Sequence, residues 1–476
     1  MKASLQINAL ESYEVLLANK NKLTVKPYAS IAYSQNLNRG SLISASYISN
    51  PDTIYSLKQP RTFNNSQNYN LGLNISINKN ANWYSQFPRY RDPNLTYKQA
   101  TAAYNGMLAL GLIEETKSGY LDREKGIGEL SKYIAHDKLL EMLKAISDNP
   151  FKVIKPDLDA ECIILRDKID GVRTIVNYED TPQTIKMREN LRFINSCLSR
   201  HWPDLRIKDE DYEPLQSRLN ADGDKTPIDF SQRTLIRIFS NGRFDNGGRF
   251  YRAWWQNVPS EYRKYITLDT KKTCEYDYSQ LNPHMIYFQC NEDMGEEDAY
   301  DRVLNGEYRD LVKEAFNAMM QSSTPLLTKP RDLDLNDVEF DWIFLRQAIL
   351  DAHKPIEDMF FKGLGNELQY IDSCIAENLM MHYAKEDQPV LPVHDSFIMH
   401  SNFGENSELE ESMRRAFYEH FKRDIPINGE IGTTLPTIHD ENKPTNTDPS
   451  NLEWENTEID YIVNYENEYS QWRDRQ

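Results

Sequence analysis

The sequence predicts an α+β fold in which helices accompany an antiparallel sheet between residues 231 and 436. Two apolar, β-prone runs lead to this prediction, and each carries one aspartate. Asp277 lies near the end of the run Thr273–Tyr278, and Asp395 lies between two apolar stretches, where a tight hairpin would present its side chain at the tip. The segments between them alternate strand-like and helical patterns, which favours a mixed sheet-and-helix region.

Residues 1–94 form a strand- and loop-rich region to which the sequence assigns no function. They are rich in Asn, Ser and Tyr, and the alternating piece Leu71–Ile77 predicts a short strand.

Residues 95–140 resemble a winged-helix unit. Thr96–Gln99 has the hydroxyl and amide of a capping box, and Gly111 follows the predicted helix where a left-handed cap is wanted. Leu112–Glu114 and Tyr120–Asp122 then predict a tight hairpin. Such a unit either binds DNA through its helix or serves as a packing module, and both interpretations stay open.

Residues 141–230 predict a helical region followed by a linker. Ala160–Leu165 is the candidate strand and Thr184–Leu198 the candidate helix, while several prolines mark a linker near 202–228. The C-terminal tail, residues 437–476, is acidic: residues 440–476 carry ten acidic and three basic side chains, a net charge of −7.

Composition excludes several classes of protein. The 476 residues are 27% charged and 39% hydrophobic, and no run approaches the roughly 20 apolar residues of a membrane span. The first residues lack the apolar core of a signal peptide. The five cysteines are scattered without a CxxC pair, which indicates neither a zinc site nor a disulfide framework, so we expect a reducing, cytoplasmic location.

The charge is strongly negative overall but uneven. The net charge is −18, which argues against a polyanionic partner. Residues 231–273, however, carry nine basic and three acidic side chains, a net charge of +6. This basic segment is either a nucleic-acid contact or a solvated face.

The two aspartates point to metal-dependent phosphoryl transfer if the fold unites them. Carboxylates on adjacent strand ends can hold two divalent cations about 4 Å apart, which is the geometry of in-line displacement. His394, beside Asp395, could bond a phosphate or a primer-end oxygen. The alternatives are a turn aspartate bonded to its own backbone at 395 and a buried ion pair with an arginine at 277.

A helix between the two aspartates carries a polar stripe. Arg309, Lys313 and Asn317 recur at spacing i, i+4 and i+8, and therefore share one face. Both cations suit a triphosphate, and Lys313 could protonate a leaving pyrophosphate. The alternative is an ordinary exposed helix face.

The segment Asn246–Tyr251 contains two glycines followed by Arg249. Glycines let a backbone approach a ligand closely, and Arg249 could contact template or primer. The alternative is a Gly-rich turn before a core strand with buried tryptophans at 254 and 255.

Together these motifs resemble the family A DNA polymerases and the single-subunit phage RNA polymerases. Asp277-Tyr278-Ser279-Gln280 resembles motif A, Arg309 with Lys313 resembles motif B, and Val393-His394-Asp395 resembles motif C. The combination is most similar to the transposon-virus polymerase branch, found in mobile elements and phages, and it covers roughly residues 231–436.

The resemblance implies a right-hand polymerase palm with reduced fingers at 231–436 and a thumb-like region within 141–230. Asp277, Asp395 and the Tyr278 carbonyl would hold two Mg²⁺, with Mn²⁺ as a substitute ion. The partners would be nucleoside triphosphates and a nucleic-acid template and primer, with no membrane and an accessory protein left open. The implied nucleotide-binding residues are Arg309, Lys313, Asn317 and Asn282, and the implied nucleic-acid-binding residues are Arg249, His394 and Gln369.

The sequence also departs from the family pattern. No aromatic residue lies eight positions after Lys313, and Asn282 stands where a glutamate or a small residue would report the sugar preference. A DNA-directed DNA polymerase is the favoured function. A DNA-directed RNA polymerase or primase-like enzyme, a DNA-binding regulator with an inactive palm, and a metal-dependent nuclease are the alternatives.

Overall fold

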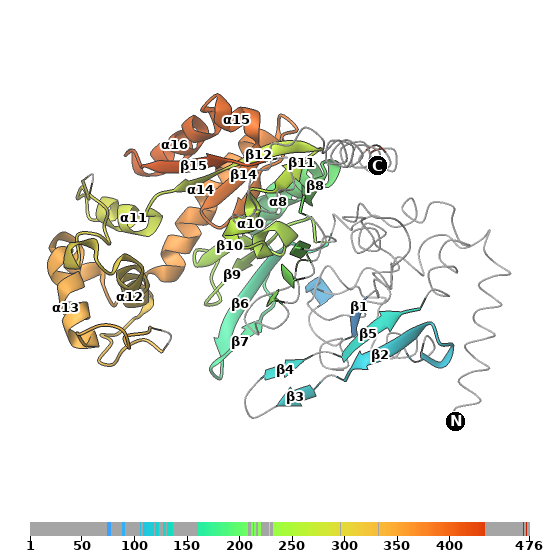
Figure 1. The fold of residues 1–476 in the computed structure, drawn as a ribbon, viewed down its shortest axis with the longest axis horizontal. Coiled ribbons are helices and arrows are strands. Elements are labelled where there is room, and N and C mark those ends of the chain that lie inside the picture. Colours follow the sequence, from blue (N-terminus) through green and yellow to red (C-terminus); the bar gives the residue numbers. More distant parts are fainter. Residues whose placement is uncertain are drawn as a thin grey trace, which may run out of the picture. The chain divides into compact units, whose positions relative to one another are not determined.

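A computed structural model of the chain describes residues 160–207 and 232–433, apart from 296 and 332 (Figure 1). Shorter pieces of residues 74–136 and isolated positions at 211–228, 470 and 473 are also described. The chain forms two compact units. The first comprises Met1–Glu161, Arg206–Arg233 and Leu435–Gln476, and the second comprises Cys162–Leu205 and Thr234–Thr434.

The first unit contains two small antiparallel sheets. A three-stranded sheet has the order β1 (Asn74–Ile77), β5 (Ser131–Ala135) and β2 (Ile113–Lys117). Strands β3 (Tyr120–Asp122) and β4 (Ile127–Glu129) pair with each other. The predicted strand at Leu71–Ile77 is confirmed in β1.

The predicted hairpin of the winged-helix unit is wrong in its pairing. Residues 112–114 and 120–122 were expected to pair, but β2 pairs with β5 and β3 pairs with β4. The five-residue β5 offers β2 a longer hydrogen-bonded ladder than the three-residue β3 does, and this long-range choice overrides the local turn signal. The helix expected before this hairpin lies mostly outside the described residues.

The second unit is built on a six-stranded, fully antiparallel sheet, which confirms the α+β prediction. The path runs β13-β14-β12-β11-β8, and β15 also pairs with β12, so β12 has a partner on each side. The strands are β8 (Pro203–Leu205), β11 (Ile266–Leu268), β12 (Lys271–Tyr278), β13 (Leu391–Val393), β14 (Ser396–His400) and β15 (Ile427–Ile431).

The linker predicted near 202–228 begins with a strand instead. Pro203–Leu205 forms β8 at the end of this path and pairs with β11, and all three of its residues are buried. A proline lacks the N–H that an interior strand must donate, but an edge position tolerates it. The proline therefore marks a sheet edge here, not a loop.

A second sheet has the order β10-β9-β6-β7, and its β6–β9 pair is parallel. Its strands are β6 (Ile163–Ile169), β7 (Val172–Ile175), β9 (Ile236–Phe239) and β10 (Gly247–Tyr251). The strand predicted at Ala160–Leu165 is confirmed in β6, shifted toward its C-terminal end.

Two long helices pack beside these sheets. Helix α8 (Pro182–Arg200) confirms the predicted Thr184–Leu198 helix, and it starts with a capping box between Thr181 and Thr184 and a proline at its first position. Helix α14 (Gly365–Ala384) packs against β10 and α8. The other described α-helices of the second unit are α10 (Ser260–Arg263), α11 (Leu281–Gln289), α12 (Arg309–Gln321), α13 (Trp342–Ala352), α15 (Ser401–Glu405) and α16 (Glu408–Phe421).

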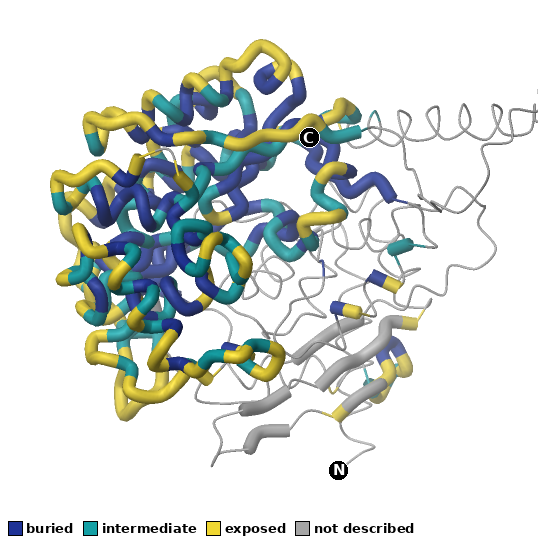
Figure 2. Tube along the Cα trace, turned by 60° about the vertical axis from the view of Figure 1, so that its left-hand side comes forward, coloured by how far each residue is buried: buried dark blue, intermediate teal, exposed yellow. Residues whose placement is uncertain are grey.

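The core of the second unit runs through its sheets and helices, as the buried parts of the tube in Figure 2 show. Trp254 and Trp255, in the 3-10 helix η3 (Trp254–Asn257), are fully buried. Tyr278 of β12 lies against Phe397 of β14 and Phe417 of α16. None of the helices in the described part of the chain is long and apolar enough to cross a membrane. The acidic tail, residues 437–476, lies outside the described residues except at 470 and 473.

Candidate active site

The pairing of β12 with β14 brings the two predicted aspartates to neighbouring positions. Asp277 lies opposite Ser396 in the strand register, so its cross-strand neighbour is the residue after Asp395. The backbone N–H of Tyr278 donates to the carbonyl oxygen of Asp395 at 3.3 Å. Two residues that are 118 positions apart in the sequence are therefore joined by one antiparallel ladder.

Asp395 belongs to the predicted hairpin, which the structure confirms. His394 and Asp395 form the two-residue connection between β13 and β14, and His394 has a positive φ of 60°. Two-residue hairpin turns require positive φ, which costs a non-glycine residue some strain. The His394 side chain is exposed and lies edge-on to Tyr251, with ring centroids 6.2 Å apart.

Two side chains of η3 hold the hairpin in place. Trp255 Nε1 and Gln256 Nε2 both donate to the carbonyl oxygen of Pro392, at 3.2 and 3.1 Å. Gln256 Nε2 also donates to the carbonyl of Phe250 in β10, at 2.9 Å. The Gln256 side chain thus ties the strand before Asp395 to the second sheet.

The aspartate pair has the electrostatics of a cation site. Burial raises the pKa of the Asp277 carboxyl, and the negative charges of Asp395 and Glu275 raise it further. The positive charges of Arg263 and Lys313 oppose this rise but do not cancel it. Clustered carboxylates are the ligands that Mg²⁺ and Mn²⁺ prefer, so the donor set fits such ions.

Tyr278 can contribute to such a site only through its backbone. Its side chain is buried, and its hydroxyl donates to the carbonyl of Met413 in α16 at 2.7 Å. Alternation along β12 directs Asp277 to the opposite face. Only the backbone carbonyl of Tyr278 is therefore left to serve as the predicted metal ligand.

Glu275 is a third carboxylate on the Asp277 face of β12, and the sequence analysis gave it no role. Its Oε2 lies 3.0 Å from Arg263 Nε, and its Oε1 accepts a hydrogen bond from Ser396 Oγ. Glu275 is thus held within the protein by an arginine and a serine. Asp277 has no comparable ion pair among the described residues, which sets the two acids apart.

Helix α12 begins at Arg309 and carries the predicted polar stripe. Lys313 is exposed, and its charge acts on Asp277, so this helix lies near the aspartate pair. Asn317 Oδ1 accepts a hydrogen bond from Asn282 Nδ2 at 3.3 Å, which links α12 to α11, just beyond Asp277. The structure thus gathers Lys313, Asn317 and Asn282 beside the site.

Arg309 is already bound to acidic residues. Its Nη2 lies 2.7 Å from Asp298 Oδ2, and its Nε lies 3.6 Å from Asp301 Oδ1. The hydrogen bond to Asp298 raises the pKa of Arg309. A triphosphate would share this guanidinium with Asp298. No motif singled out Asp298, although an acidic run from 296 to 301 lies shortly before the helix.

Asp372 of α14 is a buried acidic residue near the site that no sequence motif singled out. Its side chain is only 2% exposed, and its Oδ2 lies 2.6 Å from Arg249 Nε. Burial raises its pKa to about 7, the Arg249 charge opposes that rise, and Asp395 adds to it. An aspartate at a core position of a helix was the available signal, because such a group requires a partner.

The Arg249–Asp372 ion pair brings Arg249 to the part of α14 that carries Gln369. Gln369 lies three residues before Asp372 and so shares its face of α14. The Asp395 charge also acts on Arg249. The tryptophans that follow Arg249 are buried, as the structural alternative expected, yet its guanidinium still lies near the aspartate pair.

No protein-family model and no curated protein matches the chain. Among solved structures, the chain is similar to the POL domain of Pol1 from M. smegmatis, which was solved in complex with DNA primer-template and dNTP. The identity is 14% and the TM-score 0.31, over 46% of this chain and 49% of that chain. The chain thus spans about half the length of that structure, and a likeness of this size leaves the activity to be argued from the site itself.

Proposed function

We propose that the chain is a template-directed nucleic-acid polymerase, most simply a DNA-directed DNA polymerase that works by two-metal phosphoryl transfer. The observation that carries this proposal is the β12–β14 register, which sets Asp277 beside Asp395. The effects of the Asp395 and Lys313 charges on the pKa of Asp277 support it.

Asp277, Asp395 and the Tyr278 carbonyl would hold two Mg²⁺, or Mn²⁺ in their place. Bound there, the ions would activate a primer 3′-hydroxyl and neutralise the triphosphate. Asp277 and Asp395 would keep their carboxylates ionised to bind cations. The hairpin and the η3 hydrogen bonds to Pro392 would keep Asp395 in register with Asp277.

The other residues would bind the substrates. Lys313 would donate hydrogen bonds to phosphate oxygens and supply a proton to the leaving pyrophosphate. Arg309 would add a second cation, and Asn317 with Asn282 would line the nucleotide. On the nucleic-acid side, Arg249, His394 and Gln369 would contact the template and primer.

The test is nucleotide incorporation by the purified full-length chain. It is offered labelled dNTPs and NTPs separately, on primed and unprimed DNA and RNA templates, with Mg²⁺. We expect extension of a DNA primer with dNTPs. Because the metals contribute several kcal/mol, Asp277→Ala and Asp395→Ala should each lower the rate by about 10³-fold or more.

Asp351→Ala is the control, because Asp351 is an exposed aspartate of α13 whose hydrogen-bond partner, Gln347, lies on the same helix. It should keep full activity. Wild-type incorporation that persists in folded Asp277→Ala would remove the proposed site. A chain that binds DNA but incorporates neither type of nucleotide would be the regulator that the sequence left open.

A further inference from the structure

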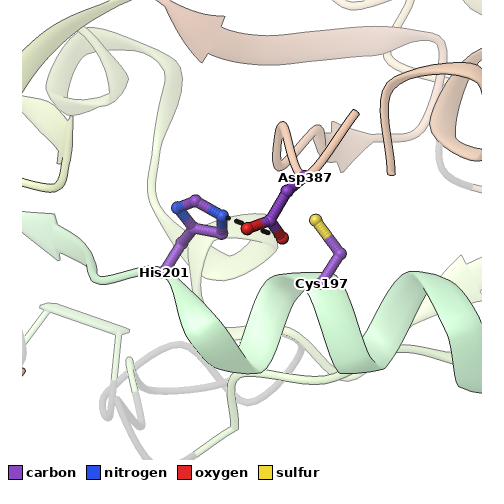
Figure 3. Close-up of side chains that lie close together, drawn as sticks. All are labelled: Cys197, His201 and Asp387. Atoms are coloured by element: carbon purple, nitrogen blue, oxygen red, sulfur yellow. Dashed lines mark ion pairs between the residues drawn. The ribbon is translucent and has the colours of Figure 1, made fainter. Parts of the chain in front are cut away.

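A second group of metal-ligating side chains lies at the end of α8 (Figure 3). It consists of Cys197, His201 and Asp387, whose ligand atoms all lie within 4.8 Å of one another. Cys197 lies in the last turn of α8, and His201 is the C-cap residue that follows the helix in an extended conformation. Asp387 comes from the turn between α14 and β13. We propose that these three residues bind a zinc-class divalent transition metal ion.

The three donors range from buried to exposed, so a metal ion could reach the site from solvent. Cys197 is 1% exposed, and the His201 side chain is 16% exposed. The Asp387 side chain is 58% exposed, which gives an ion a route from solvent. His201 Nε2 lies 3.5 Å from Asp387 Oδ1, which is close to the spacing of two ligands on one ion.

Asp269 orients His201 for this role. Its Oδ2 lies 2.6 Å from His201 Nδ1, and its Oδ1 accepts the backbone N–H of Trp202 at 2.8 Å. The Asp269 N–H donates in turn to the Trp202 carbonyl at 3.0 Å. A carboxylate on the far nitrogen of a ligating histidine is the usual outer partner of zinc sites, because it fixes the ring and leaves the other nitrogen for the metal.

Arg200 secures the third ligand. Its Nη2 and Nε lie 2.5 and 2.9 Å from Asp387 Oδ1. This pairing holds the carboxylate over the end of α8. The competing arrangement is a metal-free network in which a protonated His201 pairs with Asp269 and Asp387.

The donor set selects the metal. A thiolate, an imidazole and a carboxylate suit Zn²⁺, with water in the fourth position, whereas Mg²⁺ prefers oxygen ligands alone. This site is therefore chemically distinct from the aspartate pair. Sequence spacing could not reveal it, because the chain has no CxxC pair and Asp387 is remote from the Cys197–His201 pair in the sequence.

The ion would join the end of α8 to the turn that leads into β13, the strand before Asp395. We therefore expect metal removal to lower the thermal stability of the protein. The site contributes no group to the aspartate pair, so this inference stands whether or not the chain is a polymerase.

The experiment is Co²⁺ titration of the full-length, chelator-stripped protein, followed by absorbance. A thiolate-to-cobalt charge-transfer band should appear at one equivalent and disappear when Zn²⁺, but not Mg²⁺, is added. Cys197→Ser should abolish the band. Cys290→Ser, which changes a partly exposed cysteine elsewhere in the same unit, should keep it.

Two further variants keep the test decisive if Cys197→Ser fails to fold. Asp387→Ala changes an exposed ligand and should abolish tight cobalt binding, with an unchanged circular dichroism spectrum. Asp269→Asn changes no ligand and should weaken the affinity about 10- to 100-fold. A folded wild type without the band, or a band that survives in Cys197→Ser, would overturn the proposal in favour of the metal-free network.

Discussion

Lys313 is the cation of α12 whose charge acts on Asp277. If Lys313 donates a proton to the leaving group, Lys313→Ala should lower kcat by about 10²-fold or more, the usual contribution of a general acid. The nucleotide KM should rise as well, because a phosphate contact is lost. Steady-state incorporation kinetics measure both values.

Lys362→Ala removes an equal charge from an exposed position outside α12 and serves as the control for this measurement. It should leave both constants near the wild-type values. If the two variants behave alike, Lys313 acts only through the overall charge of the protein.

Asp372 gives the residue-scale prediction about pH. Its pKa is raised from 3.8 to about 7 by burial, so between these values the folded state holds a proton that the unfolded state has released. The Asp372 contribution to the free energy of unfolding is therefore largest at low pH and is lost as the pH rises toward 7. The slope for one proton is at most about 1.4 kcal/mol per pH unit.

Chemical denaturation of the wild type and of Asp372→Asn, at several pH values, isolates this contribution as a difference. The wild type should lose stability relative to the variant as the pH rises through this window. A difference that stays constant would mean that Arg249 keeps Asp372 ionised throughout.

At the scale of elements, α11 follows β12 and carries a buried histidine. His284 is 4% exposed, and neither ring nitrogen has a hydrogen-bond partner among the described residues. Burial lowers its pKa from 6.5 to about 4. Between pH 6.5 and about pH 4, His284 therefore binds a proton in the unfolded chain but not in the folded chain. The free energy of unfolding falls as the pH drops through this range.

His284→Leu should flatten this acid-side slope by up to about 1.4 kcal/mol per pH unit, since it removes the titrating group and keeps an apolar side chain. Denaturation curves between about pH 4 and pH 7 measure the change. His382→Leu, on the partly exposed face of α14, is the control. Parallel curves for wild type and His284→Leu would show that His284 is not buried in its neutral form.

The elements that the sequence predicted well are those with local signals. Helix α8 has its cap and its 3.6-residue period, and the hairpin at Asp395 has two apolar runs around a short turn. That Asp277 and Asp395 would meet was implied by the resemblance of their motifs to motifs A and C, and the strand-like runs alone left it open. Their order in the sheet required the long-range register of β12 with β14.

The contacts that the sequence did not predict share a physical cause: each joins two segments that are distant in the sequence and could have paired with others. The β2–β5 ladder, the edge strand at Pro203 and the Arg249–Asp372 ion pair all join segments whose pairing no local pattern specifies. Likewise, Asp298 neutralises Arg309 through a loop whose path the spacing of residues does not reveal. Such contacts are decided by burial and charge only after the chain has collapsed.

At the scale of the whole molecule, the basic segment 231–273 is largely neutralised within the protein. Five of its nine basic side chains pair with carboxylates in the described residues, and several of these pairs are buried. The pairs are Arg237–Glu377, Arg243–Asp245, Arg249–Asp372, Arg263–Glu275 and Lys272–Glu405. Internal ion pairs thus account for most of a charge pattern that the sequence offered as a nucleic-acid contact or a solvated face.

A second basic stretch of the sequence lies near the N-terminus. Residues 1–100 carry eleven basic and four acidic side chains, a net charge of +7 within a chain of net charge −18. Phosphate contacts by lysine make DNA affinity depend on salt, because each contact releases counterions. We therefore expect a variant in which Lys20, Lys22 and Lys26 are changed to Gln to bind primed DNA more weakly than the wild type.

The salt dependence identifies which charges are responsible. Fluorescence anisotropy at several monovalent salt concentrations and fixed Mg²⁺ should give a slope of log affinity against log salt that is shallower by up to about 2.7 in the triple variant, at about 0.9 per lost contact. Arg243→Gln should leave the slope unchanged, because Asp245 already neutralises Arg243. A larger effect from Arg243→Gln than from the three lysines would show that residues 231–273 carry the main salt-dependent contact.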